Sequence, residues 1–447
     1  MRRDLTNGSV AGNLFAFSLP YLLSYFLQTL YGMADLYIIG QYGLVADITA
    51  VSVGSQVMHM LTVMIVGLAM GTTVLVGRFV GAKDKKSASL AIGNTITLFA
   101  VLSVILTVLL LALVRPIVGA MFTPAAAVGG TVDYLTVCFM GIPFIVAYNI
   151  ISSIFRGLGD SKSPMVFIAI ACVTNILLDI VFMGPLSMGP RGAALGTTIS
   201  QAVSVVVSLV VILKRDTGIA PAKSDLKPQK KMLGDILRIG LPVSLQDGFV
   251  QISFMVITIL ANKRGLDDAA AVGIVEKIIG VLFLIPSSML SSVSALAAQN
   301  LGAGKPERAR KTLLYAIASA FGFGILIATS VQLCSEQIVG LFKDEPEVVR
   351  LGGEYLRSYV WDCTFAGLHF CFSGYFCALG RSGLSFFHNA CSIVLVRIPL
   401  AYYTATHFLG TLYPLGWAST LGSVLSVIIC LAAYALLNRK RRKLKSV

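Results

Sequence analysis

Long apolar runs divide the 447-residue sequence and constrain its fold more than any other feature. Each run has about 20 residues or more, the length that an α-helix needs to cross roughly 30 Å of hydrocarbon. Only 13% of the residues are charged, against about 25% in a soluble globule. The sequence therefore predicts an all-α polytopic membrane protein with twelve transmembrane helices. The predicted spans are 14–39, 48–76, 90–113, 132–154, 165–183, 193–213, 237–260, 269–297, 313–333, 353–378, 384–408 and 415–437.

The longest polar stretch separates the first six runs from the last six. It contains Pro221 and Pro228 and several basic residues, a composition typical of a linker. The sequence therefore predicts an N-lobe of helices 1 to 6, a cytoplasmic linker, and a C-lobe of helices 7 to 12 with a basic cytoplasmic tail. The predicted boundaries are 1–213, 214–236 and 237–447.

Basic residues gather in alternate connections between the runs. The segments 83–86, 305–311 and 439–443 fall on the same predicted side as the linker, and the opposite loops carry fewer basic residues. The positive-inside rule then places both termini in the cytoplasm and the chain in the plasma (inner) membrane of the cell. Orientation accounts for the net charge of +14, so we expect the lipid bilayer, and no nucleic acid, as a partner.

The two sets of six runs also resemble each other at an offset of 221 or 222 residues. Because six is an even number, both halves insert with the same topology, which predicts two six-helix lobes related by a pseudo-two-fold axis along the membrane normal. A cavity between two such lobes suits alternating access. The matching segments are SLP at 18–20 and GLP at 240–242, GAK at 81–83 and GAG at 302–304, and FRGLGD at 155–160 and FCALGR at 376–381.

Four segments in order, at 19–43, 155–165, 175–179 and 297–311, resemble the multidrug and toxic compound extrusion (MATE) family of bacterial secondary transporters. The resemblance covers essentially the whole chain and implies a twelve-helix, two-lobed exporter. It implies that amphipathic, often cationic organic compounds leave in exchange for H⁺ or Na⁺. We expect a monomer that is not an enzyme and has no cofactor and no metal other than a coupling Na⁺.

Acids inside predicted spans are the first functional candidates, because a carboxylate at a helix centre costs about 2.5 to 3.5 kcal/mol to insert. Asp179 lies one turn after Asn175, and Asp179 and Asp35 both fall in the outer half of their spans, with Thr197 at a comparable depth. The resemblance implies that Asp35, Asn175 and Asp179, together with Thr197, form a cation-coupling site. From the residues alone, Asp35 could instead cap a helix end, and Asn175 and Asp179 could be a structural pair.

Two further features belong to the same half of the chain. Pro20 removes a backbone hydrogen bond from the first span and predicts a kink that could act as a hinge. Polar, aromatic and methionine side chains could line a substrate cavity that adapts to flat cations. These cavity candidates are Gln28, Tyr31, Tyr37, Met33 and Met64.

The second half carries its own charged residues in or near its spans. The simpler interpretation is that acids and bases pair there, because intramembrane charges usually pair. The alternative is a second coupling site or a site for a substrate carboxylate. The residues are Asp247, Glu276, Lys277, Asp362 and Arg397.

Two other functions compete with that of an exporter. A flippase for lipid or lipid-linked oligosaccharide would favour a strongly cationic cavity, whereas the candidates in the first half are acidic. A polytopic membrane enzyme is disfavoured, because the sequence has no nucleophile elbow, zinc-protease motif or P-loop.

Overall fold

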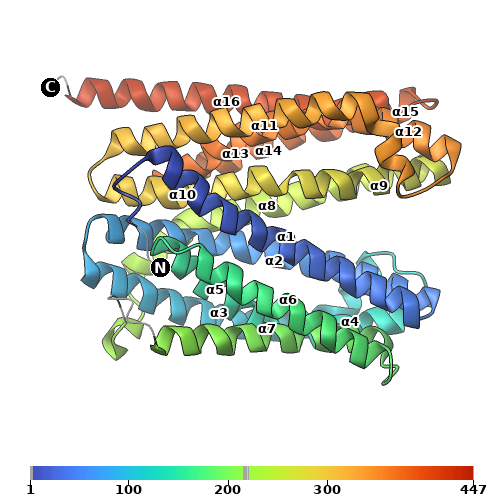
Figure 1. The fold of residues 1–447 in the computed structure, drawn as a ribbon, viewed down its shortest axis with the longest axis horizontal. Coiled ribbons are helices and arrows are strands. Elements are labelled where there is room, and N and C mark those ends of the chain that lie inside the picture. Colours follow the sequence, from blue (N-terminus) through green and yellow to red (C-terminus); the bar gives the residue numbers. More distant parts are fainter. Residues whose placement is uncertain (1–3, 215–218, 220, 446–447) are drawn as a thin grey trace. The chain divides into compact units, whose positions relative to one another are not determined.

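The computed structural model describes residues 4–214, 219 and 221–445, without the side chains of 440–445 (Figure 1). Parts of the predicted linker (215–218 and 220) and most of the predicted basic tail lie outside the described residues or side chains. All regular structure in the described part is helical. The elements are α1 (Val10–Tyr42), α2 (Val45–Gly81), α3 (Lys85–Ala120), α4 (Val128–Met140), α5 (Ile142–Gly157), α6 (Lys162–Met183), α7 (Gly189–Lys214), η1 (Lys223–Leu226), α8 (Lys230–Arg264), α9 (Leu266–Leu282), α10 (Leu284–Gly302), α11 (Pro306–Gly340), α12 (Pro346–Tyr359), α13 (Trp361–Ala378), α14 (Ser382–Ser392), η2 (Ile393–Arg397), α15 (Ile398–His407) and α16 (Tyr413–Lys445).

Helices cover all twelve predicted spans, so the all-α fold class is confirmed. In the described part, 10 helical stretches are long and apolar enough to cross a membrane, with α9–α10 and α14–α15 each counted as one stretch, and the α4–α5 pair, bent by 49°, makes 11. The predicted span 353–378 falls on α12 and α13, which are not among these stretches; α12 has 14 residues and carries Glu347, Arg350, Glu354 and Arg357.

Three spans that the sequence predicts as continuous are interrupted near a proline. The interruptions lie at Gly141, at Phe283 and in the π-helical turn η2, two or three residues before Pro143, Pro286 and Pro399. A proline ring collides with the carbonyl of the residue four positions earlier, which explains why the helix cannot continue unchanged there.

The chain forms two compact units. The N-unit comprises Met1–Asn7, Ala16–Ser244 and Ala298–Gly304, and the C-unit comprises Gly8–Phe15, Leu245–Ala297 and Lys305–Val447. The boundary therefore crosses α1 four residues before Pro20, and it crosses α8 two residues after Pro242. The lobe and linker boundaries expected from the sequence remain a prediction.

Close backbone contacts explain why the N-unit includes pieces from the second half of the sequence. A Cβ on Gly71 of α2 would lie 2.2 Å from the Ile236 carbonyl of α8, and one on Gly240 would lie 2.1 Å from the Leu68 carbonyl. The side-chain amide of Gln299 donates a 2.8 Å hydrogen bond to the Gly157 carbonyl. Such contacts need small residues, as is common between membrane helices.

Within the N-unit, α5, α6 and α7 pack around aromatic rings and small polar residues. The Phe155 and Phe167 rings meet edge to face at 5.6 Å between centroids. The Ser204 hydroxyl of α7 donates a 3.0 Å hydrogen bond to the Phe167 carbonyl of α6. This packing fixes the position of α6 against α7, the two helices that carry three of the predicted site residues.

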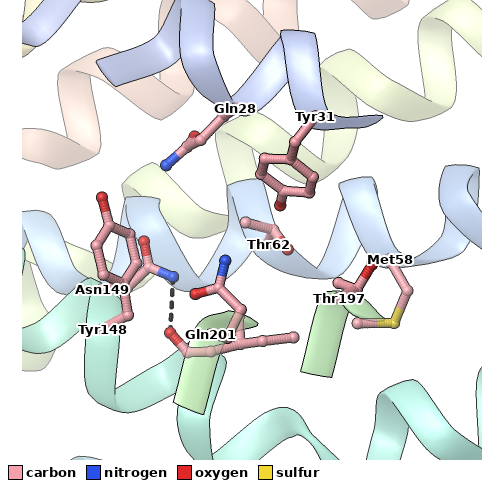
Figure 2. A pocket seen from close by; sticks show the side chains of 9 residues that line it. Gln28, Tyr31, Met58, Thr62, Tyr148, Asn149, Thr197 and Gln201 are labelled. Carbon is pink, nitrogen blue, oxygen red and sulfur yellow. Dashed lines mark hydrogen bonds between the residues drawn. The ribbon is translucent and has the colours of Figure 1, made fainter. Parts of the chain in front are cut away.

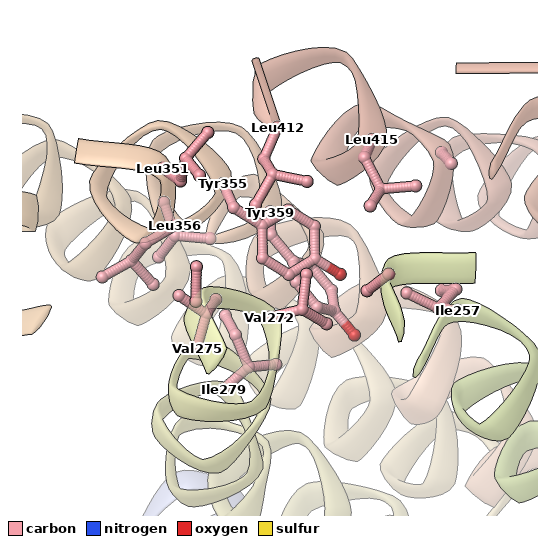
Figure 3. Packing of buried hydrophobic residues seen from close by; sticks show 14 of the residues in the cluster. Ile257, Val272, Val275, Ile279, Leu351, Tyr355, Leu356, Tyr359, Leu412 and Leu415 are labelled. Carbon is pink, nitrogen blue, oxygen red and sulfur yellow. The ribbon is translucent and has the colours of Figure 1, made fainter. Parts of the chain in front are cut away.

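The C-unit has an apolar core built from residues of α8, α9, α11, α12, α13, α15 and α16. Tyr355 and Tyr359, one turn apart on α12, lie fully buried among branched side chains of the neighbouring helices (Figure 3). Their rings contact each other at 5.3 Å between centroids. The two hydroxyl groups are thereby held inside the unit.

Candidate functional site

Three helices of the N-unit bring the four predicted coupling residues together. The Thr197 hydroxyl of α7 donates a 3.2 Å hydrogen bond to Asp35 Oδ2 of α1. On α6, the Asn175 amide donates a 3.3 Å hydrogen bond to Asp179 Oδ2. The carboxyl groups of Asp35 and Asp179 lie within hydrogen-bonding reach of each other. We call these four residues the acid pair site.

The acid pair site is buried and has spare acceptors. Asp35 is 2% exposed and Asp179 is 0% exposed. Asp35 Oδ1, Asn175 Oδ1 and Asp179 Oδ1 receive no hydrogen bond from any described residue. A buried oxygen without a donor costs free energy, and two carboxylates can share a hydrogen bond only if one of them holds a proton. The site therefore has unused acceptor oxygens that could bind a proton or another small cation.

Gly196 makes the close approach of α6 and α7 possible at this point. A Cβ at position 196 would lie 2.0 Å from Asp179 Oδ1 and 3.6 Å from Asn175 Nδ2. The missing side chain therefore leaves the space that the Asp179 carboxyl fills.

The two acids have no basic partner among the residues that the structure describes. In the described part of the chain, no Lys, Arg or His makes an ion pair within 4.0 Å with Asp35 or Asp179. Over the same residues, no group of three His, Cys, Asp or Glu side chains could hold a metal ion. The available donor set is two carboxyls, one amide oxygen and one hydroxyl, which fits H⁺ or a hard monovalent cation better than a transition metal.

A small cavity of about 40 Å³ adjoins the acid pair site through Thr197 (Figure 2). This volume holds about two or three water molecules. Residues from four helices line it, most of them with a polar group in the side chain, and the Gln201 side-chain oxygen, one turn after Thr197, has no donor among the described residues. The lining residues are Gln28, Tyr31, Met58, Thr62, Ile145, Tyr148, Asn149, Thr197 and Gln201.

Of the predicted cavity residues, Gln28 and Tyr31 line this cavity. Met33 and Tyr37 are exposed, at 57% and 69%, and Met64 is half-buried outside the lining. The sequence interpretation did not single out Thr62, Asn149 and Gln201. Gln201 could have been found, because it follows Thr197 at the i+4 spacing that shares a helix face.

Pro20 lies inside α1, which continues through it as one helix. The Ser24 hydroxyl donates a 2.8 Å hydrogen bond to the Pro20 carbonyl. The following residue, Tyr21, lies under the Arg156 guanidinium of α5, 4.0 Å from its carbon to the ring centroid. The proline therefore sits beside a point where α1 is held against α5 within the N-unit.

The predicted charges of the second half divide into three groups in the C-unit. Asp362 and Arg397 are buried, and half-buried Glu276 interacts electrostatically with Arg397. Lys277 is exposed. Asp247 lies apart on α8, where it interacts with Cys377.

Comparison with known proteins agrees with this architecture. The MatE family model matches residues 20–181 and 242–403, two segments offset by 222 residues at both ends. The "Probable multidrug resistance protein YpnP" of Bacillus subtilis (strain 168) is 28% identical over 403 residues, covering 89% of this chain and 88% of the relative. The "Multidrug export protein MepA" of Staphylococcus haemolyticus (strain JCSC1435) is 25% identical, covering 95% and 93%.

Solved structures show the same fold. A crystal structure described as MATE in the straight conformation superposes with a TM-score of 0.89 at 24% identity, covering 97% of this chain and 98% of the other. The double match of the family model confirms the internal repeat that the sequence predicts, and the apolar helices make this a multi-pass membrane protein. The chain belongs to the multidrug and toxic compound extrusion (MATE) family.

Proposed function

We propose that the protein is a secondary active multidrug exporter, which moves amphipathic, often cationic organic compounds out of the cell in exchange for H⁺ or Na⁺. The observation that carries the coupling is the acid pair site, with two buried carboxyls, three acceptor oxygens without donors and no basic partner among the described residues. The exported class follows the names of the relatives, a probable multidrug resistance protein and a multidrug export protein.

The coupling step follows from the cost of burying charge. Two carboxylates at Asp35 and Asp179 repel each other and lose their hydration, a cost of several kcal/mol per ion. Binding of one cation removes much of this cost, so the free energy of the N-unit depends on whether the site is filled. A proton would sit between the two carboxyls, and a Na⁺ would also use the Asn175 oxygen and the Thr197 hydroxyl. The cavity beside Thr197 supplies an approach to the site for either ion.

Pro20 is the proposed hinge that converts site occupancy into movement. It lies about 22 Å along α1 from Asp35, and the boundary between the two compact units crosses the helix just before it. A helix without one backbone hydrogen bond bends at lower cost, so filling of the acid pair site can change the bend of α1 and the accessibility of substrate, as alternating access requires.

The cellular setting of this proposal is the plasma membrane, with both termini in the cytoplasm and the chain acting as a monomer. The distribution of basic residues between alternate connections supports the orientation. The proposed lobes are 1–213 and 237–447, joined by the cytoplasmic linker 214–236.

Efflux of a cationic dye from proteoliposomes tests the function, with pH and Na⁺ gradients imposed separately. One of the two gradients is expected to drive efflux in the intact protein. Asp35→Asn keeps the size of the side chain and its hydrogen bond from Thr197 but removes the charge. We expect it to lower gradient-driven efflux on the order of tenfold or more.

Asp133→Asn is the matched control. Asp133 also belongs to the N-unit, but its side chain is 52% exposed and its contact to Arg191 is long, at 3.9 Å. Efflux by this variant should equal that of the intact protein. Full gradient-driven efflux by Asp35→Asn at normal expression would contradict the coupling role, and no efflux of any cationic dye under either gradient would contradict the exporter itself.

A further inference from the structure

A second buried charge cluster lies in the C-unit and differs from the acid pair site in one respect: it includes a guanidinium. We call Glu276, Asp362, Tyr359 and Arg397 the Arg397 cluster. Asp362 is 1% exposed and Arg397 is 8% exposed. The Arg397 guanidinium donates a 3.0 Å hydrogen bond to the Tyr359 hydroxyl and lies 4.6 Å from the centroid of the Phe254 ring.

A local distortion turns Arg397 into the unit. The residue ends the π-helical turn Ile393–Arg397, immediately before the Pro399-containing helix α15. π-Helical turns relieve the backbone where a proline prevents regular bonding, and they change the direction of the side chains that follow. Gly422 of α16 permits the close approach, since its Cβ would lie 3.3 Å from Arg397 Cβ.

Arg397 interacts electrostatically with both acids but makes a tight ion pair with neither. Asp362 and Glu276 are the carboxylates among its strongest charged neighbours. In the described part of the chain, Arg397 Nε and Asp362 Oδ1 both lack a hydrogen-bond partner. The guanidinium of Arg397 thus interacts electrostatically with two acids and forms an ion pair within 4.0 Å with neither of them.

The other titratable groups around the cluster do not supply a second buried positive charge. His369 of α13 shares a hydrogen-bonding neighbour with Asp362, because Ser423 contacts both side chains. Tyr355 of α12 contributes a buried hydroxyl, and Lys277 of α9 is exposed. Arg397 is therefore the buried cation of this cluster among the described residues.

The internal repeat relates Arg397 to the acid pair site. The ends of the two family matches differ by 222 residues, which pairs Asn175 with Arg397, and the nearby FRGLGD and FCALGR segments differ by 221, which pairs Asn175 with the preceding residue, Val396. With the offset of 222, Asp179 corresponds to Ala401 and Asp35 to Ile257, and both of these residues are buried, at 0% and 1%. The C-unit thus has a fixed cation within one residue of the repeat position that in the N-unit holds a neutral ligand of the acid pair, and it has apolar residues where that pair would be.

We propose that Arg397 is a built-in counter-cation for Asp362 and Glu276, which keeps mobile cations out of the C-unit and limits the transporter to one coupling site. This inference rests on the proposed function of the acid pair site. Without the guanidinium, the C-unit would hold two buried or half-buried acids without a compensating buried base, as the N-unit does. Arg397→Gln should therefore create a second site for a monovalent cation, H⁺ or Na⁺.

Thermal stability of the purified full-length chain measures this site directly, because a cation that binds the folded state raises Tm. One arm lowers the pH from 8 to 6 in Na⁺-free choline buffer, and the other replaces choline by Na⁺ at pH 8. We expect Arg397→Gln to gain several degrees more than the intact protein in at least one arm. The arm that responds identifies the ion. Arg397→Lys, which retains the charge, should respond like the intact protein.

A double variant separates the charge of Arg397 from its packing. Arg397→Gln/Asp362→Asn removes one acid together with the base, so the additional response should disappear and Tm in Na⁺-free buffer at pH 8 should rise above that of Arg397→Gln. Recovery of folding by the double variant supports the proposal even if Arg397→Gln alone does not fold. Two results would overturn it: a response of Arg397→Gln equal to that of the intact protein, or a double variant no more stable than the single one.

Asp35→Asn in the same assay reports on the acid pair site separately. If Asp35→Asn retains the full response of the intact protein, the proposed coupling function fails, whatever Arg397→Gln does. If Asp35→Asn loses its response while Arg397→Gln gains none, only the counter-cation proposal fails.

Discussion

The acid pair site and the Arg397 cluster are two responses to the same physical problem. Both bury carboxyl groups inside a helical unit, where an uncompensated charge is costly. Among the described residues, the N-unit leaves three acceptor oxygens without donors and pairs no base with them, whereas in the C-unit the Arg397 guanidinium interacts electrostatically with both acids. A buried carboxylate without a basic neighbour can bind a cation from solution. A buried carboxylate beside an arginine always has a positive charge of the protein near it. The difference between the units therefore shows where sensitivity to a cation can arise in a duplicated fold.

Removing one acid from each unit tests this contrast with the largest expected effect. Asp179→Asn should lower gradient-driven efflux on the order of tenfold or more, because the remaining carboxyl no longer has a like-charged neighbour. Asp362→Asn should keep efflux within about twofold of the intact protein and lower Tm instead, because Arg397 stays buried with one acid fewer. Dye efflux from proteoliposomes and Tm of the purified protein are the two measurements. Equal loss of efflux in both variants would show that the units do not differ in this way.

Gly196→Ala perturbs the acid pair site without touching a charge. The added Cβ would lie 2.0 Å from Asp179 Oδ1, so the carboxyl or α7 must shift. Overpacking of this kind costs about 1 to 3 kcal/mol, and we expect a lower Tm together with a weaker cation response. Gly40→Ala in α1 is the matched control, because a Cβ at position 40 meets no atom within 4 Å. Its Tm should be unchanged or slightly higher. A full cation response in Gly196→Ala would mean that the geometry of Asp179 is not critical.

The sequence predicted which residues form the acid pair site but not the space between them. Asn175 and Asp179 share a helix face by their spacing, and the depth of Asp35 and Thr197 matched theirs. Gly196 was missed, because its importance depends on how closely α6 approaches α7, which is a tertiary property. Helical geometry could have set Met33 and Tyr37 apart: each is two residues from Asp35, about 200° around the helix, whereas Tyr31 is only about 40° away.

The broken helices show a similar limit. Apolar length predicted all twelve spans, and prolines at positions 143, 286 and 399 mark where three of them are interrupted. The break at Val360, between α12 and α13, is not followed by a proline, so the sequence does not indicate it. The direction of the Arg397 side chain could not be predicted from the sequence either, because a π-helical turn changes the helix face on which this side chain lies. Arg397 has Glu276 and Asp362 as electrostatic neighbours but makes a tight ion pair with neither, and the pairing of acids and bases in the second half remains a prediction.

The smallest expected effect concerns an exposed carboxylate that could be confused with the buried ones in any pH experiment. Asp84 caps the start of α3, where its side chain accepts a 3.0 Å hydrogen bond from the Ser87 backbone amide. Hydrogen bonds from the Ser87 side chain and backbone lower the pKa of Asp84 below its ordinary value. The stabilising effect of its charge is therefore present above the unfolded-state pKa of about 3.9 and is lost as the pH falls through the lower pKa of the folded state.

Asp84→Asn keeps an acceptor but removes the charge, so its Tm should lie slightly below that of the intact protein at pH 7, and this difference in Tm should disappear below about pH 4. A gap that widens on acidification would contradict this assignment. If the gap behaves as expected, this cap contributes nothing that changes between pH 8 and 6, so a response of Tm in that range cannot come from Asp84.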